Sequence, residues 1–460
     1  MAALIAGSIS ISRYWRLTYC MLLCIFFTAC ASSSVFSPYT HQAEAYKKAM
    51  AEDDTEKVLT KLAGKANSAD KILYLSESGR IHQLSNQIDA SMDDFRLAML
   101  AYEKVDEKAK LSVSDAGALG ASLLTNDNAL PYKGFGYERI FLYQFQAFNY
   151  LSKNDIQGAS VELRRAAVEQ RVQAAEHAKA IADAEKKARQ DNAKVPPLAN
   201  VPQFVGMDTL SGGIKNSFQN AYVFYTSAVI WEAQGDTNAA LVDYKKALEL
   251  NLNNTSIQAD VKRIDGGHRL SADESALVIL YEDGFMPERQ SFRLDIPDFS
   301  KNTYWSVAFP YYSPTNWYQP QLMGVTVGNK AYGQTEVIAN FGHMAVKALQ
   351  EDITPLVIRQ ILRARAKYEI QKQASDQSAL AGLAAMVYNI VSEQADVRNW
   401  LTLPNNAQVK RVVVAPGQQQ VELKLKGMIR RVEIELRPAR TTILRVFNIN
   451  NRVKIQQYHL

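Results

Sequence analysis

Cysteine is scarce in this chain and occurs only in its first thirty residues. The 460 residues contain three cysteines, Cys20, Cys24 and Cys30. A disulfide framework, or a zinc site built on paired cysteines, is therefore excluded for the rest of the chain. The sequence also lacks the HExxH, CxxC, GxSxG and phosphate-loop motifs, so no catalytic motif supports an enzyme. We expect a protein that is not an enzyme and that holds no metal or cofactor.

Long apolar runs are missing as well. A transmembrane helix needs about 20 apolar residues, whereas the run 17–27 has 11 and the run 380–391 has 12. We interpret 380–391 as a buried helix. The net charge of +5 is too small to indicate a nucleic-acid partner. With 47% hydrophobic and 22% charged residues, the composition is that of an ordinary globular protein.

The short run 17–27 has the length of the apolar core of an export signal, and two arginines precede it. The residues that follow, Phe27-Thr28-Ala29-Cys30, resemble a lipobox, the recognition sequence of bacterial lipoprotein signal peptidase. This resemblance implies a signal peptide at 1–29 and a diacylglyceryl group on Cys30, followed by a lipidated tether at 30–42. An ordinary signal peptide is the alternative, because Ala29-x-Ala31 also fits a cleavage site.

The first residues of the tether indicate which membrane would hold the lipid anchor. Ala31 and Ser32 follow Cys30, and no Asp stands there. In Gram-negative bacteria this pattern resembles that of lipoproteins sorted to the outer membrane. The acyl chains would attach the protein firmly, because each buried CH2 group contributes about 0.8 kcal/mol. We therefore expect an outer-membrane lipoprotein whose folded part faces the periplasm.

Residues 43–265 are predicted to form a helical array. The segment 235–251 (GDTNAALVDYKKALELN) resembles the second helix of a tetratricopeptide repeat (TPR). Ala240 and Ala247 are small where a neighbouring helix crosses closely, and Tyr244 fills the groove between the helices. The same spacing of bulky and small residues recurs in other predicted helices: Phe224, Ala228, Trp231; Tyr143, Ala147, Tyr150; Ala159, Leu163, Ala166; Leu75, Gly79, His82; and Ser91, Phe95, Ala98. Helical hairpins that are not true repeats are the alternative.

One stretch, at 160–216, interrupts the array. Its first part, 160–190, predicts an extended charged helix on which Val161 and Val168 belong to a seven-residue apolar repeat. Such a helix is usually solvated and only sometimes a partner surface. The prolines and glycines of 191–216 then predict a loop.

The remainder of the chain predicts a mixed region at 266–405 and an antiparallel β region at 406–460. In the latter, apolar and polar residues alternate, as in 421–426 and 431–437, with one face toward water. We expect strands near 408–414, 419–426, 430–437, 441–448 and 452–458 in a small antiparallel sheet or sandwich, which the apolar strand near 276 could join. The fold class is therefore α+β, with a TPR-like helical array followed by a mixed domain that ends in this sheet.

Three features of the mixed region are open to functional interpretation. The stretch 303–318 (TYWSVAFPYYSPTNWY) is dense in aromatic residues, and the turn at 282–288 is acidic. Such features more often have a structural role. For the acidic turn, that role would be a salt-bridge cluster at the surface. The basic residues of 359–367 are expected on a solvated helix face. We predict that Trp400 locks a helix onto the C-terminal sheet, with Asp396 and Arg398 on the polar side.

Several segments together resemble a family of TPR-containing lipoproteins of Gram-negative bacteria. The most specific are 129–138 (ALPYKGFGYE) and 396–404 (DVRNWLTLP), with 149–151, 161–165 and 243–248 in support. The resemblance implies the location and the architecture, but no biochemical activity. Some relatives are associated with genes for lipoprotein activators of peptidoglycan synthases, which makes the peptidoglycan-synthesis machinery a candidate partner.

Two functions follow as hypotheses. The first is a lipid-anchored periplasmic scaffold whose helical hairpins leave a concave face free for other envelope proteins. The second is an envelope protein that recognises glycan or peptide through the aromatic region 303–318. The residues predicted to serve partner binding or packing are Tyr150, Trp231, Tyr244 and Trp400.

Overall fold

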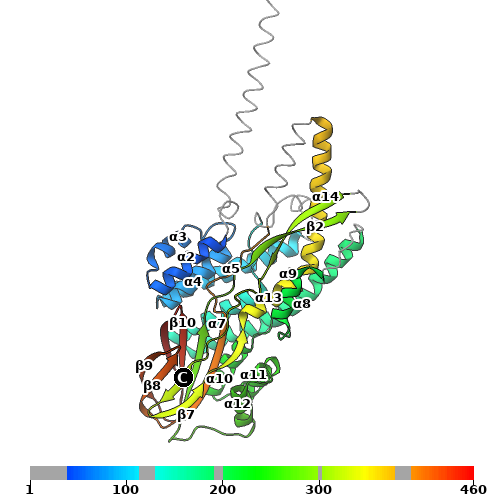
Figure 1. Cartoon of the computed structure of the whole chain (residues 1–460). Helices are drawn as coiled ribbons and strands as arrows, with labels where there is room; N and C mark the ends of the chain where they lie inside the picture. Colours follow the sequence, from blue (N-terminus) through cyan, green and yellow to red (C-terminus); the bar gives the residue numbers. More distant parts are fainter. Residues whose placement is uncertain (1–38, 113–129, 191–199, 299–302, 379–394) are drawn as a thin grey trace, which may run out of the picture.

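The computed structural model describes five stretches of the chain, 39–112, 130–190, 200–298, 303–378 and 395–460. The predicted signal peptide, Cys30 and the apolar run 380–391 lie outside these residues. The described part is α+β, with the helices in the N-terminal half and most of the sheet in the C-terminal half, as the sequence predicts (Figure 1). Within it, no helix combines the length and the apolarity needed to span a bilayer.

The three helix pairs expected from the spacing of small residues are confirmed as antiparallel hairpins. At Gly79 an added Cβ would lie 2.5 Å from the Phe95 ring, so the two helices of the first pair approach closely only because this residue is glycine. Ala147 and Ala228 are fully buried at the equivalent positions. The pairs are α4 (Lys71–Leu84) with α5 (Ile88–Ser112), α7 (Gly136–Ser152) with α8 (Ile156–Gln190), and α10 (Ala221–Ala233) with α11 (Thr237–Leu250).

Side-chain caps mark where several helices begin. The side chains of Asn220, Asp236 and Asn254 each accept a hydrogen bond from a backbone N–H in the first turn of α10, α11 and α12 (Thr255–Asp265). These bonds satisfy donors that a helix start otherwise leaves unpaired. The extended helix expected at 160–190 is α8. The described residues also form α2 (Tyr39–Glu52), α3 (Glu56–Ala63) and α9 (Pro202–Ser211). The loop predicted at 191–216 is therefore wrong for the residues of α9, and the predicted tether is wrong from Tyr39 onward, where α2 begins.

In the part of the chain that the structure describes, the strands form three sheets. A five-stranded sheet has the order β11-β10-β1-β7-β6, a four-stranded sheet has the order β5-β4-β8-β9, and β2 pairs with β3 alone. The strands are β1 (Ser275–Asp283), β2 (Gln290–Asp298), β3 (Thr303–Tyr311), β4 (Gly324–Val327), β5 (Lys330–Gln334), β6 (Glu336–Asn340), β7 (Asn406–Val414), β8 (Gly417–Leu425), β9 (Met428–Leu436), β10 (Thr441–Ile449) and β11 (Arg452–His459).

All five predicted C-terminal strands exist, but they are divided between two packed sheets. The strand expected near 276 is β1, and it lies at the centre of the five-stranded sheet, antiparallel to β7 and parallel to β10. The sheet is therefore mixed rather than purely antiparallel. The boundary expected at 405/406 runs through this sheet, because its strands come from both sides of that position.

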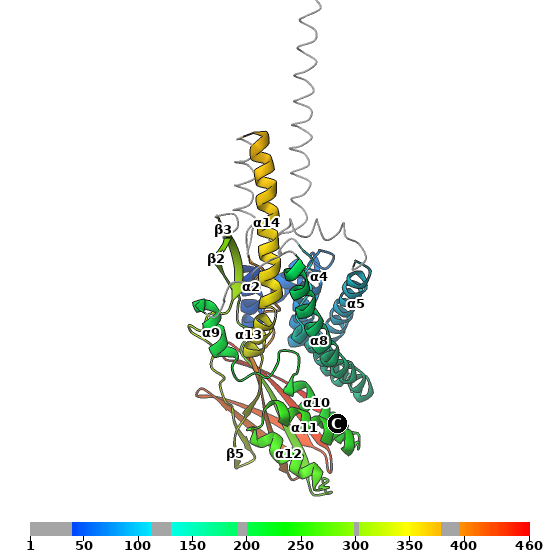
Figure 2. The ribbon, with the colours of Figure 1, turned by 90° about the vertical axis from the view of Figure 1, so that its right-hand side faces the viewer.

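The five-stranded sheet is the middle of three layers. Leu277 and Ile279 on one face of β1 contact the four-stranded sheet, whereas Val278 and Leu280 on the other face join the core of the helices. Burial on both faces explains why β1 reads as a continuous apolar run rather than an alternating one. Figure 2 shows α10, α11 and α12 in front of the sheets, with α5 and α8 beside each other to one side.

Two helices follow β6 in the mixed region, α13 (Phe341–Glu351) and α14 (Ile353–Gln377). The last turns of α14 extend away from the body of the protein, near the β2–β3 hairpin (Figure 1). The expectation that the basic residues of α14 form a solvated face is wrong for two of them. Arg363 and Lys367 are buried, and only Arg359 is exposed. Their spacing alone did not reveal that β3 and α8 pack on this side of α14.

Candidate functional site

The helices α4, α7 and α10 form what we call the inner face of the array, the side that packs on the segment 395–405 and on the five-stranded sheet. Nearly every residue of α4 and α10 is buried. The guanidinium of Arg80 in α4 pairs with Glu282 of β1, and Phe148 of α7 stacks on Tyr458 of β11. The inner face of the array is therefore covered by other segments of the chain, and it is not the free peptide-binding face that the first hypothesis expects.

The 395–405 segment lies along the inner face without regular secondary structure. Its backbone N–H groups donate to carboxylates of the array: Trp400 N to Glu138 Oε1 at 2.8 Å, and Leu401 N to Glu77 Oε1 at 2.8 Å. The hydroxyl of Thr402 also donates to Glu77. Two buried carboxylates thus receive the chain in the way that a peptide-binding groove would receive a foreign peptide.

Trp400 anchors this segment in the helical core. Its side chain is 1% exposed, and its ring centre lies 6.0 Å from that of Phe95 and 5.8 Å from that of Phe145. The predicted packing role is therefore observed, but the partners are α5 and α7 rather than the C-terminal sheet. The segment is also not helical, so Trp400 does not lock a helix in place.

Arg398 departs from the expectation that it lies on a polar surface. It is buried, and its Nη1 donates to Asp70 Oδ1 at 2.6 Å while its Nη2 contacts Asp396 Oδ2 at 2.7 Å. Nη1 also donates to the carbonyl of Leu130 at 3.1 Å. Arg398 therefore ties the 395–405 segment to the start of α4 and to the chain before α7, and the paired carboxylates make its burial tolerable.

Burial sets the protonation of the two receiving carboxylates. Desolvation raises the pKa of Glu77 to about 7, although the donors Thr402, Tyr39 and Leu401 each act in the opposite direction. Desolvation likewise raises the pKa of Glu138. A charged carboxylate is costly in a low-dielectric interior, and hydrogen bonds offset only part of that cost.

Trp231 and Tyr244, two other predicted residues, serve packing within the third hairpin. The indole N–H of Trp231 donates to Asp243 at 3.0 Å. The hydroxyl of Tyr244 donates to Glu232 at 2.9 Å and accepts from Arg411 of β7 at 3.3 Å. Both side chains are buried. Trp231 therefore holds the third hairpin together, Tyr244 also joins it to β7 of the sheet, and neither lies on a free surface.

Tyr150 lies in a different environment, a groove on the opposite side of the array. This outer groove is a hollow of ≈ 640 Å³ between α5, α7 and α8. Tyr143 and Tyr150, both half-buried, contribute from α7. Three large apolar side chains beside them are exposed, namely Leu100 (42%), Val161 (45%) and Val168 (48%). The two valines are those of the seven-residue repeat, so that repeat faces a hollow surface.

The outer groove has a charged rim of both signs. Arg96 and Glu103 line it on α5, and Arg165 and Glu169 line it on α8. Arg164 contributes less freely, because its guanidinium lies 4.5 Å from the ring centre of Trp231. An apolar floor with a polar rim is the usual anatomy of a protein-binding surface.

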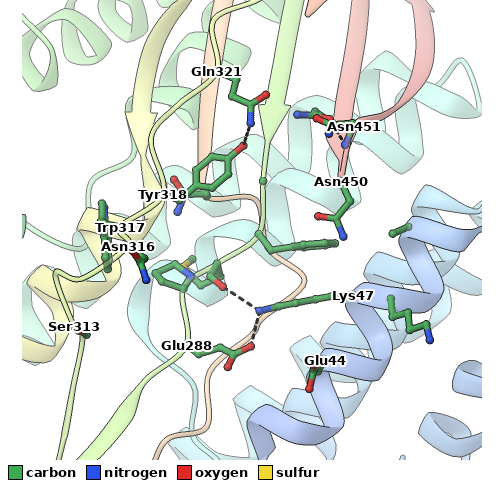
Figure 3. A pocket seen from close by; sticks show the side chains of 18 of the residues that line it. Glu44, Lys47, Glu288, Ser313, Asn316, Trp317, Tyr318, Gln321, Asn450 and Asn451 are labelled. Carbon is green, nitrogen blue, oxygen red and sulfur yellow. Dashed lines mark hydrogen bonds and ion pairs between the residues drawn. The ribbon is translucent and has the colours of Figure 1, made fainter. Parts of the chain in front are cut away.

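A second hollow, which we call the strand-end cleft, lies between α2 and the loops that follow β1, β3 and β10 (Figure 3). Its volume is ≈ 830 Å³. Lys47 of α2 pairs with Glu288 at 3.0 Å on one side, and Trp317 and Tyr318 lie on the other (Figure 3). The end of the aromatic stretch and the end of the acidic turn thus meet in one cleft.

Neither the aromatic stretch 303–318 nor the acidic turn 282–288 forms a single surface. In the aromatic stretch, Phe309 and Tyr312 are core residues, Tyr304 is exposed on the β2–β3 hairpin, and only 313–318 reaches the cleft. In the acidic turn, Glu282 is buried. Burial alone would raise the pKa of Glu282, but Arg445 and Arg80 hold it below its ordinary value. The expected surface salt-bridge cluster is therefore mainly a buried ion pair, and only Glu288 remains at the surface.

The residues that sequence reasoning missed are polar and buried. Glu77 carried no recognisable signal, Glu138 lay inside the 129–138 motif without an assigned role, and Asn405 followed the 396–404 motif. In the part of the chain that the structure describes, no group of three or more His, Cys, Asp or Glu side chains is arranged to hold a metal ion. No protein-family model, curated protein or solved structure matches this chain.

Proposed function

We propose that this protein is a lipid-anchored adaptor of the Gram-negative outer membrane that binds another envelope protein through its outer groove. The observation that carries the proposal is the cluster of exposed apolar side chains, Leu100, Val161 and Val168, beside Tyr143 and Tyr150. Apolar side chains that gather around a hollow on a soluble surface usually mark an interaction site. The protein acts by binding, and no enzymatic step is part of the proposal.

The partner that fits the groove is an amphipathic helix of an envelope protein. α5 and α8 form its two walls and α7 its floor, so an added helix would pack against all three. Its apolar side would cover the valines and tyrosines, and its charged edges would meet the exposed Glu103 on α5 and Arg165 on α8. The inner face is a poor alternative, because the 395–405 segment and the sheet already occupy it.

Anchoring rests on Cys30, which lies outside the described residues. The lipobox-like sequence supports acylation there. The resemblance to TPR-containing lipoproteins adds the peptidoglycan-synthesis machinery as a candidate source of the partner. An anchored adaptor whose outer groove is open would hold such a partner close to the outer membrane.

Photo-crosslinking in living cells tests the groove directly. The crosslinking amino acid p-benzoylphenylalanine is placed at Val168, in the groove, and in a second strain at Val242. Val242 is the matched control because it is a valine on the second helix of another hairpin and is 51% exposed. We expect a discrete crosslinked species with an envelope protein from position 168 and none from position 242.

The outcome at the two positions decides the proposal. Crosslinks of equal yield at both positions would indicate non-specific collisions, and no crosslink at 168 across growth conditions would exclude the groove as a docking site. Mass spectrometry of the specific species identifies the partner and the crosslinked peptide. We expect that peptide to have apolar residues at spacings of three and four.

A further inference from the structure

The strand-end cleft is a second candidate site, built from other elements than the outer groove and independent of the adaptor function. Its lining is rich in side-chain amides. Two glutamines, Gln290 and Gln321, line it together with five asparagines. The asparagines are Asn316, Asn405, Asn448, Asn450 and Asn451. A carboxamide both donates and accepts hydrogen bonds without carrying charge, so this lining is suited to a ligand with many neutral polar groups.

Charge in the cleft is balanced. Three carboxylates line it and three lysines do so as well. Lys47 pairs with Glu288 at 3.0 Å, and Lys48 lies 3.9 Å from Glu52. An excess of one sign would select an ion, whereas these pairs largely cancel each other. The cleft therefore favours a ligand without net charge.

Several polar atoms in the cleft wall have no hydrogen-bond partner within the described chain. Both side-chain atoms of Asn405 are in this state, and so are Gln321 Oε1 and Trp317 Nε1. Asn405 is fully buried. Buried polar groups are nearly always paired in folded proteins, so a group of them around one hollow indicates a polar ligand that supplies the missing partners.

The side chains around Asn405 can lie this close to the backbone only because two neighbouring residues are glycines. An added Cβ at Gly342 would lie 2.9 Å from Asn405 Nδ2 and 3.2 Å from the Trp317 ring. Gly284 has φ of +70°, and an added Cβ there would lie 2.9 Å from the Tyr318 ring. Two glycines thus let the Asn405 amide and both aromatic rings converge on one place.

A buried carboxylate holds the wall in position. Asp283, at the end of β1, accepts hydrogen bonds from Tyr318 Oη, Gln321 N and Asn448 Nδ2, each at 2.9 Å. Figure 3 shows Gln321 bonded to the Tyr318 hydroxyl on the wall that faces Lys47. Groups that are fixed before a ligand arrives lose little entropy on binding, so the cleft is preorganised.

We propose that the strand-end cleft binds a neutral oligosaccharide with N-acetyl groups. Sugar hydroxyls and acetamido groups donate and accept like the amides that line the cleft, and each can pair with a carboxamide in both directions. The half-exposed rings of Trp317 and Tyr318 offer apolar surface to the C–H faces of a sugar ring. An uncharged peptide is the competing occupant, and the experiment separates the two.

The test is a titration of the full-length protein, purified in detergent, with an oligomer of N-acetylglucosamine. A glucose oligomer of equal length and an uncharged Gly-Ser-Asn peptide are titrated in parallel, and binding is followed by ligand-observed NMR. The cleft variants are W317L and N316A. The control is N154A, because Asn154 and Asn316 are both exposed and have φ of 58° and 57°, so the two substitutions have the same local backbone effect.

We expect saturable binding of the N-acetylated oligomer that weakens at least about tenfold in both cleft variants and is unchanged in N154A. The melting temperature of each variant shows whether the fold is retained, and N316A keeps the test valid should W317L unfold. Binding that N316A and folded W317L leave unchanged would overturn the proposal. So would selective binding of the peptide, or the absence of glycan binding up to the solubility limit of the oligomer.

Discussion

The same three helical hairpins present two faces that differ in what covers them. On the inner face, Glu77 and Glu138 receive the backbone of the 395–405 segment, and Trp400 is enclosed between α5 and α7. On the outer groove, Val161 and Val168 remain nearly half-exposed beside Tyr150. The comparison shows that a repeat-like helical array does not by itself leave the face made by its first helices open.

The inner face and the outer groove differ in the hydrogen-bond acceptors that they offer to an extended chain. An extended chain segment can be buried only where its N–H groups find acceptors, and the inner face supplies two carboxylates for that purpose. The outer groove offers apolar side chains and a charged rim instead. It therefore suits a helix, whose backbone is already paired internally, better than an extended peptide.

The largest effect is expected on the inner face, from Trp400→Ala. Removal of this ring leaves a cavity between Phe95 and Phe145, and we expect a loss of about 3–5 kcal/mol in the free energy of unfolding. Chemical denaturation followed by circular dichroism measures it. Val168→Ala is the control on the outer groove, and a loss there as large as that of Trp400→Ala would contradict the distinction between the two faces.

Protonation of Glu77 should make the inner face sensitive to pH. Burial raises the pKa of Glu77 from 4.5 to about 7 in the folded protein. Between these values the unfolded chain has lost the proton while the folded chain keeps it, so the free energy of unfolding falls as pH rises. The loss levels off above about pH 7. Its size is on the order of 3 kcal/mol, because one pKa unit corresponds to about 1.4 kcal/mol.

Comparison with Glu77→Gln isolates this contribution from other titrating groups. The glutamine is neutral at every pH, so the variant should lose less stability between pH 4.5 and pH 7 than the unsubstituted protein. Denaturation curves at several pH values within that window provide the measurement. Parallel pH profiles for the two proteins would show that Glu77 does not hold a proton in the folded state.

On the outer groove, Val168→Glu should change binding and leave the fold intact. The site is nearly half-exposed, so we expect a change in stability within about 0.5 kcal/mol. A charge buried against an apolar partner helix is costly, and crosslinking from position 161 should fall at least about tenfold. The equivalent change at Val242 serves as the control. Undiminished crosslinking in Val168→Glu would place the partner elsewhere.

Cys30→Ser should have the smallest effect on either face and the clearest effect on location. We expect the folded protein to keep its melting temperature and to lose the incorporation of labelled fatty acid. Globomycin, which inhibits lipoprotein signal peptidase, should make an unprocessed form of the unsubstituted protein accumulate. If the Cys30→Ser protein still fractionates as an integral component of the outer membrane, the anchor lies outside Cys30.

Local patterns in the sequence predict most of the elements. Small residues such as Ala147 and Ala228 mark the helix pairs, because only a small side chain lets two helices approach closely. The alternation in 421–426 and 431–437 identifies β8 and β9, whose other face is exposed. Tyr150, Val161 and Val168, which line the outer groove, were also recognisable as candidates for a partner surface.

The failures at Arg363 and Arg398 have one cause, which is that a charged side chain does not reveal its partners. The sequence predicts that Arg363 and Arg398 lie at the surface, yet both are buried. Arg398 is tolerated there because Asp70 lies within hydrogen-bond distance, and Asp70 is 328 residues away along the chain. A pairing over such a distance leaves no periodic signal in the sequence.

The sequence by itself determined where the helix pairs and the C-terminal strands form, because the spacing of apolar and small residues acts over a few positions. It also contains the lipobox-like segment that supports the proposed anchor. The tertiary structure alone decided that C-terminal strands divide between two sheets and that the 395–405 segment fills the inner face. It also brought Asn405, Trp317 and Lys47 to one cleft. These outcomes depend on which buried donors meet which acceptors, and such contacts join residues too distant for any local pattern to specify.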